Sequence, residues 1–407
     1  MTPRQRTISL YLTGGALLCA AWLFGLRTHP VPSSPEPSAV IAASTPEAAA
    51  NAAAVDPQRA APLVQVALLL DTSGSMDGLI EQAKSQLWRM VNELARARRN
   101  GQQPRVELAL YEYGNTNASA ERGWVRQIVA FTTELDRVSE ALFALTTAGG
   151  DEWSGRTIDL AMKELEWSRD PSALKMIFVA GNEAFNQGPD DPYQVVKRAA
   201  AQGITVSTIY CGDSSSADAQ GWKSGALLAD GRFMTIDHNV QVVDVAAPQD
   251  QALAVLGVEL NQTYVPYGTE GRVAQARQKE QDDNSKRYGA ANFGTRAASK
   301  ASAQYYNPSW DLVDATNGGA VELGKLDEAA LPEELKNLSP EERQAFIRAK
   351  QQKREELQAK IRALSAERDR FVAEARKQQA DRPTSLDAAM IEAVRSQATK
   401  RGFAFAE

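Results

Sequence analysis

Residues 64–75 read Val-Gln-Val-Ala-Leu-Leu-Leu-Asp-Thr-Ser-Gly-Ser. The seven residues before Asp71 are mainly apolar, which is typical of a strand that is buried on both faces of a sheet. Two hydroxyl residues, Ser73 and Ser75, follow the acidic residue directly. In open α/β sheets, ligands bind outside the carboxyl ends of the strands. This stretch therefore predicts a functional loop as well as a strand.

The side chains of this loop indicate a metal site. Asp71, Ser73 and Ser75 together offer only oxygen ligands, which suit Mg²⁺, Mn²⁺ or Ca²⁺ better than zinc. Gly74 allows a backbone turn tight enough for both serines to face one ion. The simpler alternative is that Asp71 only caps the helix that follows. The position of the loop between a buried strand and a long amphipathic helix favours the metal site.

Strands alternate with helices over the region that follows. Such alternation predicts an α/β fold with a doubly wound, mostly parallel, Rossmann-like sheet. We assign this fold to residues 62–262 and expect the helix at 249–260 to close it. We expect strands at 64–70, 106–113, 125–131, 174–180, 204–210 and 233–236, and helices at 77–99, 134–145, 157–168, 190–201 and 249–260.

The order of these elements, together with the Asp71-Thr72-Ser73-Gly74-Ser75 loop, resembles the von Willebrand factor A (VWA) domain and its metal-ion-dependent adhesion site (MIDAS). The resemblance implies that Asp71, Ser73 and Ser75 hold a divalent cation such as Mg²⁺. In that family a second loop supplies a threonine and a third loop an aspartate. The open position of the metal is filled there by an acidic side chain of a protein partner.

The second and third loops depart from the family pattern. The threonine position falls near Asp151 in the loop 149–155, so we expect a carboxylate in place of the hydroxyl, with Thr146 and Thr147 slightly upstream as the weaker alternatives. The third loop reads Gly181-Asn182 where an aspartate is expected, with Glu183 next as a substitute ligand. A domain that keeps the fold without the metal is the alternative. The predicted ligand set is Asp71, Ser73, Ser75 and Asp151.

Two aromatic residues, Trp153 and Phe185, are expected near the rim of this loop. Exposed aromatic side chains at that place would suit a protein-binding surface. Such residues also commonly pack a loop from beneath, and the sequence leaves both alternatives open.

The N-terminus predicts a membrane anchor. Arg4 and Arg6 precede an almost continuous apolar run over residues 8–26, which ends at Arg27. Nineteen residues in a helix span about 28 Å, close to the thickness of the hydrocarbon core. The alternative is a cleaved signal peptide, whose apolar core is usually shorter and is followed by small residues.

The flanks of the apolar run predict its orientation. Basic residues precede the run, whereas Glu36 and Glu47 follow it, so we expect residues 1–7 in the cytoplasm and the main body outside it, in the periplasm. Residues 27–61 are rich in Pro, Ala and Ser and cannot build a core, which indicates a flexible linker.

The C-terminal part is polar and helical in pattern. Residues 263–338 are interpreted as a linker with a docking segment, and residues 339–407 as a helical, partly coiled-coil region. Self-association through these helices is therefore an alternative role for the protein. The heptad-like seam of the long helix consists of Ile347, Leu357, Ile361, Leu364 and Phe371, and it is interrupted by Lys350, Arg354 and Arg368. With the segments Tyr264-Val265-Pro266-Tyr267-Gly268 and Trp310-Asp311-Leu312-Val313-Asp314, this arrangement resembles uncharacterised bacterial membrane-anchored VWA proteins.

Composition excludes several other functions. A net charge of −6 argues against a general nucleic-acid binder. The two histidines, His29 and His238, have no partners at zinc-ligand spacing, and no G-x-S-x-G nucleophile elbow is present. We therefore expect a protein that is anchored in the inner membrane, binds a protein partner and is not an enzyme. A metal-free scaffold is the main alternative, and a hydrolase using carboxylates near 71, 151 and 183 is a remote one.

Overall fold

The computed structural model describes residues 61–237, 245–377 and 385–405. The predicted anchor at 8–26 lies outside these residues, as does almost all of the predicted linker. Within the described part of the chain, every helix is too short or too polar to cross a membrane.

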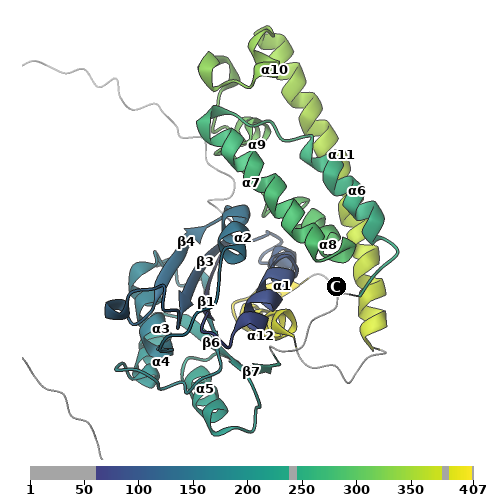
Figure 1. The fold of residues 1–407 in the computed structure, drawn as a ribbon. Helices are drawn as coiled ribbons and strands as arrows, with labels where there is room; N and C mark the ends of the chain where they lie inside the picture. The colour runs from purple at the N-terminus through teal and green to yellow at the C-terminus, as the bar shows by residue number, and fades with distance from the viewer. Residues whose placement is uncertain (1–60, 238–244, 378–384, 406–407) are drawn as a thin grey trace, which may run out of the picture. The chain divides into compact units, whose positions relative to one another are not determined.

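A six-stranded sheet forms the centre of the first domain (Figure 1). Its strand order is β4-β3-β1-β5-β6-β7, and all neighbours run parallel except β3 and β4. The predicted doubly wound, mostly parallel α/β fold is thus confirmed. The strands are β1 (Leu63–Asp71), β3 (Arg105–Tyr113), β4 (Arg126–Thr132), β5 (Leu174–Gly181), β6 (Ile204–Cys211) and β7 (Phe233–Ile236).

Helices cover both faces of this sheet because its central strands are apolar on both sides. The even-numbered residues of β1 pack with α1 (Asp77–Arg96) and α2 (Leu135–Phe143). The opposite face packs against α3 (Ser154–Glu164), α4 (Pro192–Ala201) and α5 (Ala217–Leu228). The sequence did not predict α5, whose few large apolar residues give no clear helical periodicity.

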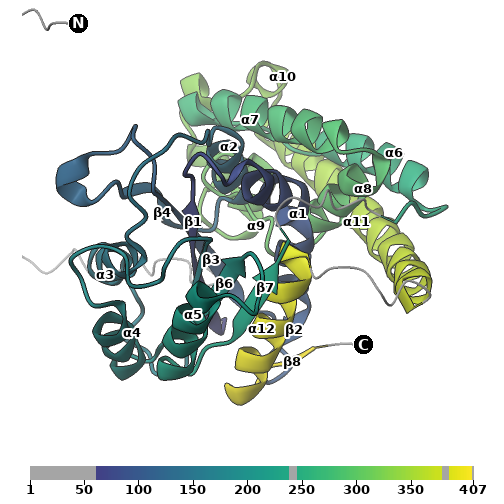
Figure 2. The same cartoon turned by 60° about the horizontal axis from the view of Figure 1, so that its bottom comes forward.

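The last helix, α12 (Leu386–Lys400), completes the first face of the sheet. It lies beside α1 and against β5, β6 and β7 (Figure 2). Its apolar residues, among them Met390 and Val394, belong to the same core as β1. The strand β8 (Ala404–Phe405) follows it and pairs with β2 (Ala97–Arg98) at the end of α1.

The remaining helices form a second region with its own two apolar clusters. The helix that we expected to close the sheet domain, α6, buries Leu253 and Leu260 against α8 and α11 of this region instead. Its apolar side chains face Trp310 and Leu357, so helix packing decides its position. The helices are α6 (Asp250–Asn261), α7 (Gly268–Arg287), α8 (Ala290–Lys300), α9 (Leu312–Asn317), α10 (Glu333–Lys336) and α11 (Pro340–Lys377). Single 3₁₀ turns lie at Ala120–Arg122, Leu323–Lys325 and Glu328–Ala330.

The seam of α11 is used within the chain. Leu357 and Ile361 are fully buried against the other helices of the region. Arg354 and Arg368 interrupt the apolar pattern because each enters a buried ion pair. Most of the seam expected to form a coiled coil thus packs within this chain, whereas Phe371 at its end stays exposed.

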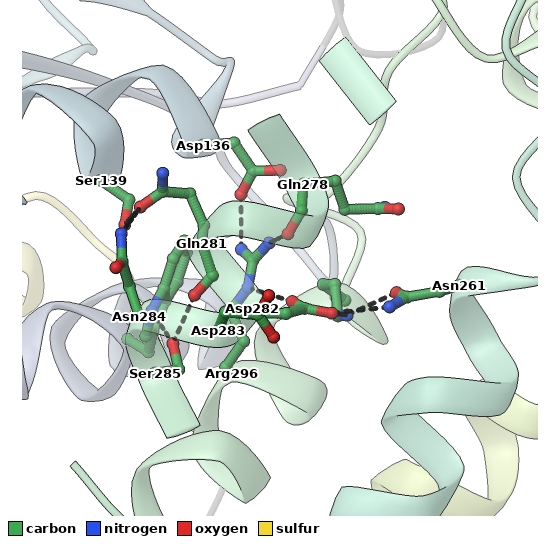
Figure 3. Close-up of polar contacts among 12 residues, drawn as sticks. Asp136, Ser139, Asn261, Gln278, Gln281, Asp282, Asp283, Asn284, Ser285 and Arg296 are labelled. Atoms are coloured by element: carbon green, nitrogen blue, oxygen red, sulfur yellow. Dashed lines mark hydrogen bonds and ion pairs between the residues drawn. The ribbon is translucent and has the colours of Figure 1, made fainter. Parts of the chain in front are cut away.

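A buried polar network joins the helical region to the sheet domain (Figure 3). Arg296 of α8 is completely buried and lies 2.5 Å from Asp136 of α2 and 2.9 Å from Asp282 of α7. Its guanidinium also lies over the ring of Trp88 on α1, at 4.2 Å. Burial would raise the pKa of Asp282, but Lys300 and Arg296 together lower it to about 2. The network fixes the two regions against each other through paired charges.

Candidate metal centre

The first loop forms directly at the end of β1. The backbone N–H of Ser73 donates to Asp71 Oδ1 at 2.7 Å, which turns the chain toward α1. The hydroxyls of Ser73 and Ser75 lie 3.3 Å apart. Asp71 is fully buried, and its Oδ2 atom has no hydrogen-bond donor among the described residues. The three residues predicted from the sequence are therefore brought together.

The second loop brings Glu152, and not Asp151, to this place. The Asp151 side chain is exposed, whereas Glu152 is buried and interacts with Asp71. Glu152 Oε2 is buried without a hydrogen-bond partner in the described structure. Gly114 makes this approach possible, because a Cβ atom there would lie 2.9 Å from both Asp71 Oδ1 and Glu152 Cγ.

The third loop contributes Asn182. Its Nδ2 donates to the Ser75 hydroxyl at 3.0 Å, and its Oδ1 is buried with no partner among the residues described. The Glu183 side chain is exposed, while its carbonyl accepts a hydrogen bond from the Trp222 indole at 2.8 Å. Asn182 therefore lies closer to the first loop than the predicted substitute Glu183 does.

Tyr113 explains the loss of the third-loop aspartate. Its hydroxyl donates to the Ala180 carbonyl at 2.8 Å, beside Gly181. A Cβ atom at position 181 would collide with this hydroxyl and lie 3.1 Å from Asp71 Oδ2. The space that an aspartate would need is thus filled by the end of β3.

The two buried carboxyl groups share an acidic environment. Burial is the main reason that the pKa of Asp71 is raised, against the opposing hydrogen bonds from Glu152 and Ser73. Burial and the negative charge of Asp71 raise the pKa of Glu152 to about 9. At neutral pH, without a cation, Glu152 therefore keeps its proton, which lowers the negative charge at this buried place.

The arrangement fits a hard divalent cation. When both carboxyl groups are ionised, three buried oxygens lack hydrogen-bond donors in the described structure, and the hydroxyls of Ser73 and Ser75 lie beside them. An all-oxygen set of carboxylates, hydroxyls and an amide suits Mg²⁺. In the described ranges no three Asp, Glu, His or Cys side chains converge, so the hydroxyls and the amide must complete such a set. The three oxygens are Asp71 Oδ2, Glu152 Oε2 and Asn182 Oδ1.

The two aromatic residues near the site take different positions. Phe185 is buried and packs against Trp222, so it supports the third loop from beneath. Trp153 is half-buried and contacts Trp124 edge to face, with ring centroids 5.2 Å apart. A Cβ atom at Gly188 would clash with the Trp153 ring, so the glycine there makes room for the indole. Loop packing thus explains Phe185 completely and Trp153 in part.

Comparison with known proteins identifies the domain. Residues 65–241 match the sequence model of the von Willebrand factor type A domain, so this part of the chain is a VWA domain. No curated protein sequence matches the chain.

Solved structures with a similar fold include conserved hypothetical protein BatB from Bacteroides thetaiotaomicron, at 17% identity, covering 43% of this chain and 90% of that one, with a TM-score of 0.33. The VWA domain of SpRpn10 has 15% identity over 44% of this chain and 90% of that one, with a TM-score of 0.35. The vWF domain of the type V pili tip protein Mfa5 from Porphyromonas gingivalis has 13% identity over 43% of this chain and 90% of that one, with a TM-score of 0.33.

Proposed function

We propose that this protein binds a protein partner through its VWA domain, at a divalent cation held by the three loops of the candidate metal centre. The observation that carries the proposal is the group of buried oxygens beside Ser73 and Ser75, which have no hydrogen-bond donors among the described residues once Glu152 is ionised. Asp71 and Glu152 would supply the charge, and the serine hydroxyls and Asn182 would complete the set. The cation would be Mg²⁺, with Mn²⁺ and Ca²⁺ as chemically similar alternatives.

The charge of the site limits what it can attract. Two carboxylates neutralise a divalent cation, so the ion would pull less strongly on an acidic partner group than a site with one carboxylate does. We therefore propose that contacts of the surrounding loops contribute to partner binding together with the metal. The half-buried Trp153 is the aromatic side chain best placed for such a contact.

The proposed location in the cell rests on the sequence alone. We propose a single-pass anchor at 8–26 in the inner membrane, with residues 1–7 in the cytoplasm and the VWA domain in the periplasm. Fractionation of cells tests this: the full chain should sediment with membranes, and a version that begins at residue 62 should not. Recovery of both versions in the soluble fraction would contradict the anchor.

Metal titration tests the centre directly. Calorimetry of the purified chain with MgCl₂ or MnCl₂ should show one site, and Asp71→Ala and Glu152→Gln should each weaken it at least tenfold. Asp151→Asn is the matched control, because this carboxylate is exposed and adjacent in sequence. Loss of binding in Asp151→Asn with Glu152→Gln unaffected would assign the site to the residue predicted from sequence instead.

Partner capture tests the role of the metal. Envelope proteins retained by the immobilised chain in MgCl₂ should be released by EDTA and absent with Asp71→Ala. An unchanged set of retained proteins would exclude metal-dependent binding. A non-enzymatic role is part of this proposal, since the residues around the centre would act as metal ligands.

The structure weakens the argument for the alternative role, a metal-free scaffold that assembles through its C-terminal helices. That role relied on the seam of α11 for assembly, and Leu357 and Ile361 in that seam are buried by the chain's own helices. We therefore keep the binding role as the proposed function.

A further inference from the structure

A cleft of about 920 Å³ lies away from the candidate metal centre, between α1, α8, α11 and α12. The metal loop precedes the first residue of α1, whereas the cleft is lined by its last turns. A helix of the 20 residues in α1 is about 30 Å long. The cleft is therefore a separate surface from the candidate metal centre.

The lining of the cleft is strongly basic in an acidic protein. It contains seven arginines and three acidic residues, although the whole chain carries a net charge of −6. The acidic residues are already engaged. Glu93 pairs with Arg395 at 2.6 Å, Asp369 pairs with Arg96, and Asp314 lies 2.8 Å from Arg354. Two more of the lining arginines pair with carboxylates outside the lining, Arg89 with Asp387 at 2.7 Å and Arg368 with Asp250 at 2.5 Å. The remaining positive charge of the cleft lies with the other arginines.

Two of the arginines illustrate the imbalance. Arg98 donates to the carbonyls of Ala95 and Ala97, at 2.8 Å each. Arg362 is exposed and donates to the carbonyl of Ala301 at 3.2 Å. Within the described residues, both guanidinium groups therefore contact neutral backbone oxygens and not carboxylates. Guanidinium groups with free donors bind carboxylate and phosphate groups in a forked geometry.

Apolar residues lie between the charges. Ala298, Ala366, Val372 and Ile391 also line the cleft, and the last of these is only partly buried. An occupant that meets this lining needs apolar groups beside its negative charges. A polypeptide offers both on alternating side chains, whereas a phosphate backbone offers charge without apolar groups.

We propose that this cleft binds an acidic segment of a polypeptide partner, with carboxylates on Arg98 and Arg362 and apolar side chains against α8 and α11. The chain's existing ion pairs across the cleft follow the same chemistry, since Arg96 of α1 holds Asp369 of α11. A carboxylate-rich ligand would add to these pairs without requiring a new kind of contact. The cleft would thus be a second partner-binding surface, independent of the metal.

The experiment uses the full chain and a defined probe. A fluorescein-labelled dodecapeptide of alternating Glu and Leu is titrated by fluorescence anisotropy at 50 mM and 300 mM NaCl, in EDTA. We expect saturable binding that weakens at the higher salt concentration, because the contacts are between charges. A peptide with Gln in place of Glu should not bind.

Charge reversal locates the binding surface. Arg362→Glu should weaken peptide binding at least tenfold, while Arg370→Glu should change it less than twofold. Arg370 is an exposed arginine of the same helix that does not line the cleft. If the melting temperature of Arg362→Glu is below that of the wild type, the double variant Arg98→Gln/Arg362→Gln, which removes charge without reversing it, replaces it in this experiment. Asp71→Ala should bind the peptide normally, which separates this proposal from the metal centre.

Three outcomes would overturn the proposal. Equal binding by Arg362→Glu and Arg370→Glu would place the peptide elsewhere on the surface. Tighter binding of a labelled oligothymidylate, lost in Arg362→Glu, would assign the cleft to nucleic acid. Competition of the peptide by millimolar inorganic phosphate alone would identify a simple anion site.

Discussion

At the scale of single residues, Asp71 and Glu152 decide the chemistry of the candidate centre. Each is buried, and together they place two carboxyl groups where water cannot solvate both charges. Without a cation, a proton on Glu152 removes one of those charges. A divalent cation would displace that proton, so metal binding and proton release are linked.

This linkage predicts how stability depends on pH. The pKa of Glu152 is about 9 in the folded protein and near its ordinary value of 4.5 when unfolded. Between pH 4.5 and pH 9 the folded state binds a proton at Glu152 that the unfolded state does not. The stabilisation of the folded state by this proton is therefore fully present below pH 4.5 and is lost as pH rises toward 9. In EDTA, the melting temperature of the wild type should therefore fall more steeply from pH 6 to pH 9 than that of Glu152→Gln. The slope is at most about 1.4 kcal/mol per pH unit.

Scanning fluorimetry measures the melting temperature of both proteins at each pH. Subtracting one curve from the other removes the effect of the other titrating groups, which the two proteins share. MgCl₂ at pH 8.5 should raise the melting temperature of the wild type and leave Glu152→Gln nearly unchanged. Parallel pH curves for the two proteins would show that Glu152 is ionised in the folded state.

The sequence placed three residues of the candidate centre side by side for a clear physical reason. Asp71, Ser73 and Ser75 follow a buried strand, so the end of the strand fixes their place. Glu152 comes from a loop without regular structure, where the alternation of side chains is not determined by a helix or strand. A shift of one residue was enough to exchange it for Asp151. The effect of Tyr113 on Gly181 depends on the neighbouring strand and is visible only in three dimensions.

At the scale of helices, buried arginines set the position of α11. Arg354 lies 2.6 Å from Asp311 and 2.8 Å from Asp314, and its guanidinium stacks at 4.1 Å on Tyr264. It also donates to the backbone carbonyl of Thr263 at 2.7 Å. One side chain therefore ties α11 to α9 and to the segment that follows α6.

Removing this arginine should be costly. In Arg354→Ala two buried carboxylates lose their partner, and breaking a buried pair costs about 3–5 kcal/mol. Urea denaturation should show a loss of that size, while Arg370→Ala, an exposed change on the same helix, should stay within about 0.5 kcal/mol. A loss below 1 kcal/mol in Arg354→Ala would mean that water replaces the arginine.

The helical pattern predicted α11 but not the helices against which it packs. Leu357 and Ile361 lie at spacings that fit either a coiled coil or packing within one chain. The basic residues at 354 and 368 appeared as interruptions because their acidic partners, Asp311 and Asp250, lie far away in the sequence. The helices that determine the position of α6, namely α8 and α11, are likewise remote from it in the sequence.

At the scale of the whole molecule, the network around Arg296 joins two regions with separate cores. Arg296 pairs with Asp136 of the sheet domain and with Asp282 of the helical region. The Ser139 hydroxyl also donates to Gln281 Oε1 at 2.8 Å across the same junction. Unfolding of either region leaves these buried groups unpaired, so the two should unfold together.

Asp136→Ala should uncouple them. The completely buried Arg296 would keep only Asp282, and we expect a loss of about 3 kcal/mol with a broader thermal transition. Hydrogen exchange should show α7 and α8 opening before β1 and β3. Asp283→Ala is the control, because Asp283 is an exposed neighbour of Asp282 that pairs with Lys286 on the surface. A single sharp transition in Asp136→Ala would show that apolar contacts alone couple the regions.

The packing of α12 has a consequence for how the chain is made. Leu386, Ala393 and Phe403 fill the same core as Leu68 of β1. More than 300 residues separate the two contributions, so translation must continue almost to residue 403 before that core can close. During synthesis, α1 and α2 can already cover part of this face, but the apolar surface that α12 covers over β5, β6 and β7 stays exposed. That surface is open to aggregation until the end of the chain is made.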